Sequence, residues 1–400
     1  MESLPREIIV NILTRLPIMS VLQLKKVCRS WRAFMQDASL STMLLALATE
    51  RNPCLILHHD SPIRNQLFFL DDDAKNGYSK AVRKVSLPFT SVMPEFDVSG
   101  SCNGFLCLSD SLLAETIFLY NPFFQEHMEL PKTLNCANHD VVIGFGFVSA
   151  SNEYKVIRIV YYMEPCDRLR RSVYQQRSQV DLFTLGKDHS WRIVGSAKYR
   201  IHRHSPKILL NGFLHWVVIP YNCRPSPSRI ILAFDFTTEK FEVVPCPRWE
   251  RPVRHTFQLA EIQGCLSAVV NCKDGSIDIW VMKEYKVRES WMKEFTIGNY
   301  VPIGLNPRLS RPIRIWRNGM SRGSVQVLCS LKCGKLLLEY ENQALVCYDP
   351  SGGNFEEFII HGLPEWFRSV VTHVGNLFSF EAEIVRSKSL LGDIRSACYS

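Results

Sequence analysis

The sequence predicts a multidomain α plus all-β chain, in which a small helical domain at the N-terminus precedes a much larger all-β domain. Three observations support this prediction. Apolar residues recur at helical spacing through residues 1–51. From residue 52 onward this pattern disappears, and short runs of Val, Ile, Phe, Leu and Tyr alternate with turn-forming residues. These runs also recur as a repeated unit, which is typical of a repeat architecture.

The composition is that of an ordinary globular protein. Of the 400 residues, 46% are hydrophobic and 22% are charged, which leaves enough apolar side chains for a sizeable core. No stretch approaches the roughly 18 consecutive apolar residues that a membrane-spanning helix needs. The N-terminus, Met1-Glu2-Ser3, carries an acidic residue instead of the cationic start of a secretory signal. We therefore expect a protein without a membrane partner, located in the cytoplasm, the nucleus or both.

Motifs for catalysis or cofactor binding are missing from the sequence. It contains no phosphate-binding Gly-rich loop and no HExxH metal motif. The 14 cysteines are scattered without CxxC spacing, and we interpret them as small buried hydrophobic residues. His58-His59, and likewise His202 and His204, lack a second set of metal ligands. The sequence therefore predicts no catalytic residue, no metal site and no cofactor, and we expect the protein not to be an enzyme.

The first helix is predicted between Pro5 and Pro17. Pro5 is tolerated in a first helical turn, and the residue before Pro17 avoids the helical backbone conformation, so the helix ends there. A second helical stretch begins at Ser20, a suitable N-cap. Its apolar set is too wide for one helix, so we expect a break near 28–30 and two short helices that share Trp31. A last stretch, 41–51, is also helical in composition.

This helical module carries more apolar residues than it can cover. A module of this size is close to the lower limit for independent folding. Its surplus apolar residues could pack on the rest of the chain. Alternatively, a second protein could cover them, as in helix-mediated recognition.

Many positions in residues 2–45 follow a single pattern. Leu4-Pro5 precedes a helix with the aliphatic pair Ile12-Leu13, Leu16-Pro17 ends that helix, and a Val27-Cys28-Arg29 run leads to Trp31-Arg32. This order closely resembles the F-box, so we assign residues 1–45 to an F-box and 46–52 to a linker or helix end. The resemblance implies a trihelical domain that binds a Skp1-like adaptor and, through it, a cullin.

The resemblance also assigns adaptor-binding residues. Carried over position by position, the set is Leu4, Pro5, Ile8, Ile12, Leu13, Leu16, Pro17 and Leu24, to which Val27, Cys28 and Trp31 are added. The last three could belong either to the adaptor-binding face or to the core of the module.

Two elements recur in the all-β region. The first is a small turn followed by an apolar strand, as in Asn103-Gly104-Phe105 and Asn211-Gly212-Phe213, with variants at 144–147, 264–269 and 334–338. Because these strands are almost wholly apolar, we expect them to be buried on both faces and innermost in each unit. The second element is an outer hairpin, as at Tyr120-Asn121-Pro122 and Tyr348-Asp349-Pro350. We expect one more strand between the two elements.

Four-stranded units repeated around an axis make a β-propeller, which limits exposed sheet edges. The repeats indicate six blades, with seven as the alternative. The runs 370–372 and 377–380 are expected to pair back onto the first unit and close the ring. We assign residues 53–383 to the propeller and 384–400 to a C-terminal tail.

The β region resembles the plant F-box-associated, kelch-like domain. The resemblance rests on Ser101-Cys102-Asn103-Gly104-Phe105, Tyr120-Asn121-Pro122, Gly144-Phe145-Gly146, Tyr154-Lys155-Val156 and Asn211-Gly212-Phe213-Leu214-His215-Trp216. The chain departs from true kelch repeats because the internal Gly-Gly pair is missing from nearly every unit. The resemblance implies a plant origin.

Together the two resemblances imply the substrate-recognition subunit of an SCF-type E3 ubiquitin ligase. The F-box would bind the adaptor, and the propeller would recruit a protein substrate for ubiquitination. Such a subunit is a non-catalytic adaptor, because the thioester chemistry resides in other proteins. The alternative is a propeller-containing binding or scaffold protein that acts outside a ubiquitin ligase.

Arginine-rich segments are the candidate substrate contacts. They lie in stretches that contain Pro, Ser and Gly and are typical of loops, which gather at the ends of a propeller. The net charge of +8 would suit an acidic partner. The alternative, which such basic patches more often represent, is a solvated loop surface. No nucleic-acid-binding module accompanies the charge, so no nucleic acid is expected. The candidate substrate-binding residues are Arg168, Arg170, Arg171, Arg248, Arg251, Arg254, Arg311, Arg314 and Arg317, within segments 168–171, 248–254 and 308–322.

Overall fold

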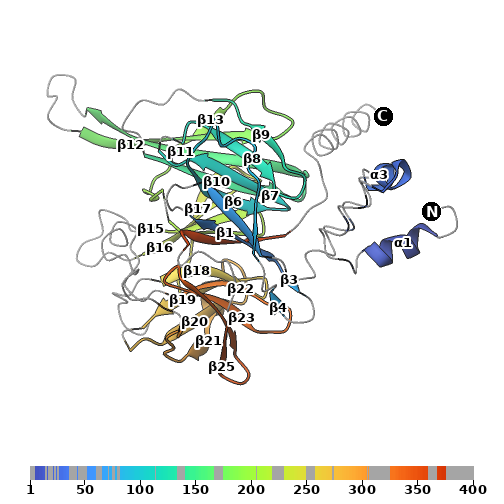
Figure 1. Ribbon diagram of the computed structural model, residues 1–400. Coiled ribbons are helices and arrows are strands. Elements are labelled where there is room, and N and C mark those ends of the chain that lie inside the picture. Colours follow the sequence, from blue (N-terminus) through green and yellow to red (C-terminus); the bar gives the residue numbers. More distant parts are fainter. Residues whose placement is uncertain are drawn as a thin grey trace, which may run out of the picture.

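Six four-stranded antiparallel sheets form a six-bladed β-propeller, and two described helices lie beside it (Figure 1). The computed structural model describes residues 5–13, 16, 21, 24, 27–35, 43, 52–59, 65–70, 72–73, 77–78, 82–112, 114–132, 140–165, 174–203, 205–218, 229–248, 257–272, 274–303, 305, 325–358 and 367–374. The prediction of six blades is confirmed.

Each blade is built from four consecutive strands, except the first. Blade 2 contains β6 (Phe96–Cys102), β7 (Phe105–Asp110), β8 (Ile117–Asn121) and β9 (Glu126–Glu129). Blade 3 contains β10 (Asp140–Val148), β11 (Glu153–Pro165), β12 (Tyr174–Thr184) and β13 (Arg192–Gly195). Blade 4 contains β14 (Lys207–Leu210), β15 (Phe213–Val218), β16 (Ile230–Asp235) and β17 (Lys240–Val244).

The last two blades follow the same order. Blade 5 contains β18 (Phe257–Ile262), β19 (Cys265–Asn271), β20 (Ile277–Met282) and β21 (Trp291–Ile297), with the 3-10 turn η2 (Arg288–Ser290) before β21. Blade 6 contains β22 (Val325–Ser330), β23 (Leu336–Tyr340), β24 (Ala344–Asp349) and β25 (Asn354–Glu357).

The first blade closes the ring. It contains β1 (Cys54–His59), β2 (Gln66–Leu70) and β5 (Arg83–Lys84), and its remaining strand is β26 (Ser369–His373) from the far end of the chain. β26 pairs antiparallel with β1, so that Leu57 lies opposite Val370. The predicted ring closure through 370–372 is confirmed, while 377–380 lies outside the described residues. A two-stranded hairpin, β3 (Asp72–Asp73) and β4 (Gly77–Tyr78), lies between β2 and β5.

The first strand of each blade borders the centre of the ring. β6 contacts β10 and β26, and β18 contacts β14 and β22, which links the innermost strands of neighbouring blades. The apolar strands that follow Asn103-Gly104 and Asn211-Gly212 are β7 and β15, which are second in their blades. The prediction that these strands are innermost is therefore wrong. Both the first and second strands are covered by neighbouring blades, so burial alone does not reveal radial order.

The prediction of a turn at 144–147 is also wrong. Gly144 and Gly146 do not form a turn but lie within β10. A Cβ atom on Gly144 would lie 2.3 Å from Leu214 Cδ2, and one on Gly146 would lie 2.3 Å from the Phe236 ring. These glycines are needed because the side chains of blade 4 approach the backbone of blade 3 closely.

In blades 2, 4 and 6 the turns between the third and fourth strands share one hydrogen bond. Asn121 Oδ1 accepts a bond from the Phe123 N–H at 3.0 Å, and Asp235 Oδ1 accepts one from the Thr237 N–H at 2.8 Å. Asp349 Oδ1 accepts the equivalent bond from Ser351 at 2.9 Å. A short Asn or Asp side chain stabilises such a turn locally, which explains why this sequence element recurs.

The described helices are α1 (Arg6–Leu13) and α3 (Arg29–Met35). Much of the region predicted to be a trihelical domain lies outside the described residues, so the three-helix arrangement stays a prediction. Neither described helix is long and apolar enough to cross a lipid bilayer.

Candidate interaction surfaces at the two ends of the propeller

The direction of the strands divides the propeller into two ends. Strands alternate in direction within each blade, so the connections from first to second strand and from third to fourth strand share one end, here called the turn face. The remaining connections lie at the opposite end, here called the loop face. Turn-face connections such as 103–104 and 122–125 are short, although the connection 71–82 between β2 and β5 contains the β3–β4 hairpin. Loop-face connections include the long segments 219–229 and 298–324. Long variable loops on a rigid scaffold are typical binding surfaces.

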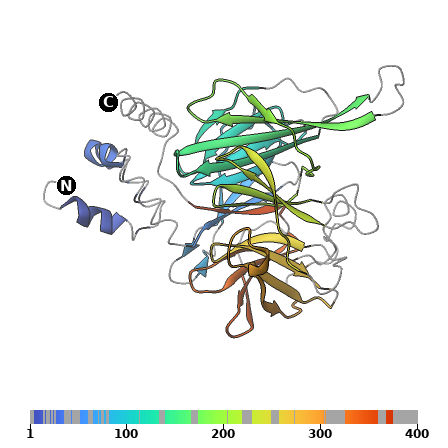
Figure 2. The ribbon, with the colours of Figure 1, turned by 180° about the vertical axis from the view of Figure 1, so that it is seen from behind.

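The helical module lies at the turn face. β1, which follows the module, begins at this face, and β26 ends there. Phe124, in the turn between β8 and β9, packs against the buried cluster of the module, which contains Ile9, Val10, Leu13 and Val21. Figures 1 and 2 show α1 and α3 on one side of the propeller, and on the other side the end of the β11–β12 hairpin at which β11 ends and β12 begins. The module and the loop face are therefore at opposite ends.

Helix α1 has a covered side and an exposed apolar side. Ile9, Val10 and Leu13 are buried. Ile8 and Ile12, which are four residues apart and therefore lie on the same side of the helix, are 47% and 49% exposed. The two isoleucines therefore form a small exposed apolar patch on the helix.

The other predicted adaptor-binding residues fall into three groups. Pro5, Val27 and Cys28 are exposed. Leu13 is buried in the module's own core, and Leu16, Leu24 and Trp31 are partly buried against that core. Leu4 and Pro17 lie outside the described residues. Exposure thus separates residues that are free to meet a partner from those that stabilise the module, and adaptor binding stays a prediction.

The predicted substrate-binding arginines lie in connections that begin and end at the loop face. Segment 166–173 joins β11 to β12, 245–256 joins β17 to β18, and 298–324 joins β21 to β22. Of the nine arginines, Arg248 alone lies within the described residues. Arg168, Arg170, Arg171, Arg251, Arg254, Arg311, Arg314 and Arg317 lie outside them.

Arg248 is exposed at the boundary between blades 4 and 5. Its Nη2 lies 3.1 Å from Glu289 Oε1, and both side chains are more than half exposed. Glu289 is in the turn-face connection between β20 and β21, so the Arg248 side chain lies away from the loop face, although its connection begins and ends there. An ion pair in such contact with water contributes little to stability. A partner could therefore bind Arg248 with little loss of stability from breaking its ion pair with Glu289.

A second group of basic residues at the loop face has no counterpart in the sequence analysis. Arg203, Lys207 and Arg368 gather around Asp97, from segments that are far apart in the sequence. None of them belongs to an arginine-rich segment. Their proximity depends on three blades, so no local pattern could have revealed it.

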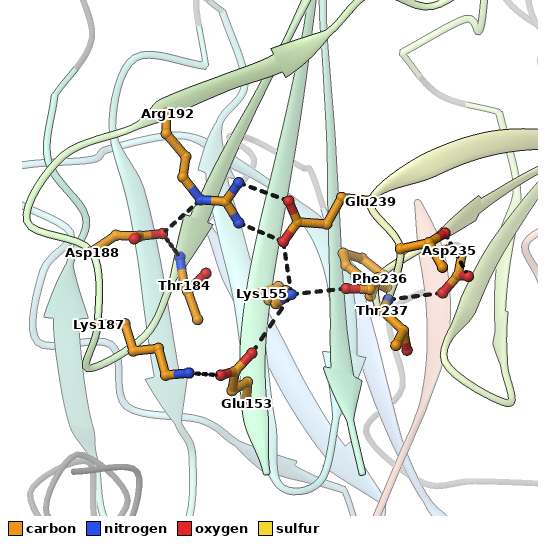
Figure 3. Close-up of polar contacts among 11 residues, drawn as sticks. Glu153, Lys155, Thr184, Lys187, Asp188, Arg192, Asp235, Phe236, Thr237 and Glu239 are labelled. Atoms are coloured by element: carbon orange, nitrogen blue, oxygen red, sulfur yellow. Dashed lines mark hydrogen bonds and ion pairs between the residues drawn. The ribbon is translucent and has the colours of Figure 1, made fainter. Parts of the chain in front are cut away.

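The turn face carries a different charged cluster, which joins blades 3 and 4 (Figure 3). Lys155 Nζ donates to Glu239 Oε1 and to the Phe236 carbonyl, each at 2.9 Å. Glu239 also accepts a bond from Arg192 Nη1 at 2.7 Å, and this interaction lowers the pKa of the Glu239 carboxyl. Glu153 pairs with both Lys155 and Lys187.

Every charged side chain named in that cluster is paired with an opposite charge. Lys155 and Glu153 are each 7% exposed, so their functional groups are committed to the contact between blades. We interpret the cluster as a structural one that holds blade 3 against blade 4.

The described residues also bear on metal and thiol chemistry. Among them, no three His, Cys, Asp or Glu side chains come together in the manner of a metal site. The ten described cysteines are all free thiols, of which Cys54, Cys107 and Cys347 are buried. Burial raises the pKa of Cys107 to about 12, which disfavours the thiolate that a nucleophile requires.

Comparisons with protein families match both parts of the chain. The family described as "F-box domain" matches residues 1–41, and the family described as "F-box associated beta propeller domain" matches residues 54–382.

Relatives from Arabidopsis thaliana match most of the chain. An F-box protein of this plant is 44% identical over 400 residues, covering 96% of this chain and 94% of its own. The F-box protein CPR1 is 25% identical over 412 residues, covering 98% and 90%. An F-box/kelch-repeat protein is 26% identical over 303 residues, covering 74% and 80%.

Proposed function

Because the chain belongs to the F-box proteins that carry an F-box-associated β-propeller domain, we propose that it is the substrate-recognition subunit of an SCF-type E3 ubiquitin ligase. In this proposal a trihelical F-box binds a Skp1-like adaptor and, through it, a cullin. The propeller recruits a protein substrate, in the cytoplasm, the nucleus or both. The subunit has no catalytic role of its own.

The observation that carries the proposal is the exposed apolar side of α1. Ile8 and Ile12 are about half exposed, although the same helix buries Ile9 and Leu13 in the module. Full burial of an isoleucine stabilises an association by roughly 1.5–3 kcal/mol. A partner helix on this side would therefore gain substantially from covering both residues.

The opposite placement of module and loop face supports the second half of the proposal. An adaptor on the exposed side of α1 would leave the loop face free for a substrate. Catalysis would then come from proximity, because holding a substrate near the ubiquitin-carrying enzyme raises its effective concentration. The arginine-rich connections 166–173, 245–256 and 298–324 are the proposed substrate contacts.

Co-purification with a Skp1-like adaptor tests the proposal. The full chain is co-expressed with the adaptor as wild type and as the double variant Ile8→Gln and Ile12→Gln. Glutamine is a good helix former, so α1 is preserved while its apolar side is lost. We expect the wild type to co-purify with the adaptor, and the double variant to bind it at least about tenfold more weakly.

The matched control replaces two exposed apolar residues of the propeller. Ile193 in β13 and Val243 in β17 are 68% and 52% exposed, and the double variant Ile193→Gln and Val243→Gln should retain the adaptor. A folded wild type that does not bind the adaptor would favour a binding or scaffold role outside a ubiquitin ligase. If the α1 double variant still binds the adaptor, α1 is not the adaptor-binding surface.

A further inference from the structure

At the inner edge of the loop face, three cations surround one carboxylate. Asp97 Oδ1 accepts a hydrogen bond from Arg368 Nε at 2.9 Å, and Arg203 Nη2 lies 3.7 Å from Asp97 Oδ2. The Lys207 ammonium is close enough to Asp97 and Arg203 for both charges to affect its pKa.

The four residues come together because they lie at the loop-face ends of innermost strands. Asp97 is in β6 of blade 2, and Arg368 directly precedes β26 of blade 1. Lys207 is the first residue of β14 in blade 4, and Arg203 lies four residues before it. The cluster therefore sits where blades 1, 2 and 4 approach the centre of the ring.

Arg203 and Lys207 also donate hydrogen bonds to backbone carbonyls, which carry no net charge. Arg203 bonds the backbone carbonyls of Asp110 and Leu112, the latter at 2.8 Å. Lys207 Nζ donates to the Ile143 carbonyl at 2.7 Å. These carbonyls orient the side chains but do not neutralise their charge, so positive charge exceeds negative charge among the four residues.

The side chains of the cluster are half-buried. The side chains of Arg203, Arg368 and Asp97 are 17%, 21% and 13% exposed. Burial lowers the pKa of Lys207 to about 8, and the neighbouring Arg203 charge also lowers it. Partial desolvation also strengthens any ion pair formed at these half-buried side chains.

Apolar side chains beside the cluster favour a peptide over a small ion. Leu112, whose carbonyl accepts the Arg203 bond, is 74% exposed, and Val92 in the preceding connection is 55% exposed. A bond of 3.2 Å from the Ser111 N–H to the Glu95 carbonyl ties the two connections together. An inorganic anion would gain nothing from these apolar neighbours.

We propose that Arg203, Lys207 and Arg368, arranged around Asp97, bind a side-chain carboxylate of an acidic peptide segment in the substrate. The proposal rests on the proposed function, which makes the loop face the substrate face, and it specifies the chemistry of that substrate. Asp97 holds the three cations in place in the free protein and competes with the incoming carboxylate.

Fluorescence anisotropy on the purified full chain tests this proposal. The probe is a fluorescein-labelled hexapeptide of Glu and Leu with both ends capped, so that side chains provide its only carboxylates. We expect Arg203→Gln and Lys207→Met each to weaken binding about tenfold or more, because each removes a charge-assisted hydrogen bond. Asp97→Asn removes the competing carboxylate and should tighten binding about threefold or more.

Lys198→Met is the matched control, because Lys198 is exposed in the same connection as Arg203 but its ammonium lies over the Tyr199 ring, outside the cluster. This change should alter affinity less than about twofold. Equal losses in Lys198→Met and Arg203→Gln would show only a diffuse attraction and overturn the site. Arg368→Gln, with the unfolding midpoint of each variant, provides a second test if Lys207→Met fails to fold.

Two further peptides define the ligand. A peptide with Gln in place of Glu should not bind, and comparable affinity would overturn the proposal. If the chain binds a phosphoserine peptide but not the Glu peptide, the site recognises phosphate instead of a carboxylate, and the proposal is overturned. Adaptor co-purification is measured on the same samples. If the chain binds the peptide but not the adaptor, the ligase function is contradicted and the carboxylate site stands. If the chain binds the adaptor but not the peptide, the carboxylate site alone is contradicted.

Discussion

The indole N–H of Trp291 donates a 2.7 Å hydrogen bond to the carbonyl oxygen of Pro245, across the boundary between blades 5 and 4. The same contact recurs between blades 3 and 2, where Trp191 Nε1 donates to the Pro131 carbonyl at 2.6 Å. In both cases the tryptophan is next to or in the fourth strand of its blade, and the proline follows the fourth strand of the blade before it. At these two boundaries a hydrogen bond thus links the outer strands of neighbouring blades.

Loss of either tryptophan–proline bond should destabilise the propeller. Trp291→Phe leaves the Pro245 carbonyl without its donor, which we expect to lower the free energy of unfolding by about 1–3 kcal/mol. Trp191→Phe should have a similar effect. Because the two bonds lie at separate boundaries, the double variant should show the sum of the two changes in urea unfolding. A double variant no less stable than either single variant would contradict independent fastening.

The buried Lys155 should contribute far more stability than an exposed lysine with a comparable ion pair. Lys155→Met leaves Glu153 and Glu239 without their shared cation in a mostly buried setting, and we expect a loss of about 3 kcal/mol. Lys335→Met, whose partner Glu356 lies 3.2 Å away and is 69% exposed, should cost under about 0.5 kcal/mol. Urea unfolding of both variants measures the difference, and similar losses would refute the structural role of the turn-face cluster.

Gly146 should not tolerate even a methyl group. In Gly146→Ala the new Cβ would meet the Phe236 ring at 2.3 Å, so blade 4 must shift, at about 1–3 kcal/mol. Gly298→Ala is the matched control, because a Cβ there meets nothing within 4 Å. Thermal unfolding should show a lowered midpoint for the first variant and little change for the second.

His373 should make the stability of the ring sensitive to acid. The side chain is fully buried, with Nδ1 3.0 Å from Ser101 Oγ, and burial lowers its pKa to about 3. In the unfolded chain the same histidine takes up a proton below about pH 6.5. Its contribution is therefore present above pH 6.5 and is lost progressively as the pH falls from 6.5 towards 3.

At pH 5.0 this loss should reach roughly 2 kcal/mol relative to pH 7.5. His215, whose pKa is lowered to about 4 by burial, should add to it. Urea unfolding of His373→Gln should show a lower stability at pH 7.5 but a shallower decline on acidification. His189→Gln, at an exposed position, should leave the decline unchanged. Parallel pH curves for the wild type and His373→Gln would contradict the assignment.

Features that depend on local backbone chemistry could be predicted from the sequence. Asn103-Gly104 and Asn211-Gly212 are predictable as turns. Both residue types tolerate positive φ, and all four residues adopt it, with φ values from 44° to 83°. The pairing of 370–372 with the first unit was also predictable, because a propeller without it would leave an unpaired edge.

Features that depend on distant neighbours could not be predicted. Gly144 and Gly146 look like turn glycines until Leu214 and Phe236 of the next blade are seen beside them. Helical spacing predicts the apolar residues of α1 but not which side of the helix is buried. That side depends on packing against Val21 and Phe124, which are distant in the sequence. Arg203, Lys207 and Arg368 are unremarkable single residues in the sequence, and only the ring brings them to Asp97.

The late position of β26 in the chain has a consequence for biosynthesis. The first blade to emerge from the ribosome is the last to be finished, since β1 must wait for residues 369–373. Until then its inner edge has unpaired N–H and C=O groups, which invite aggregation and proteolysis. A polypeptide that terminates prematurely, before residue 367, cannot acquire this strand and keeps the exposed edge. Ring closure therefore requires that synthesis has passed residue 373.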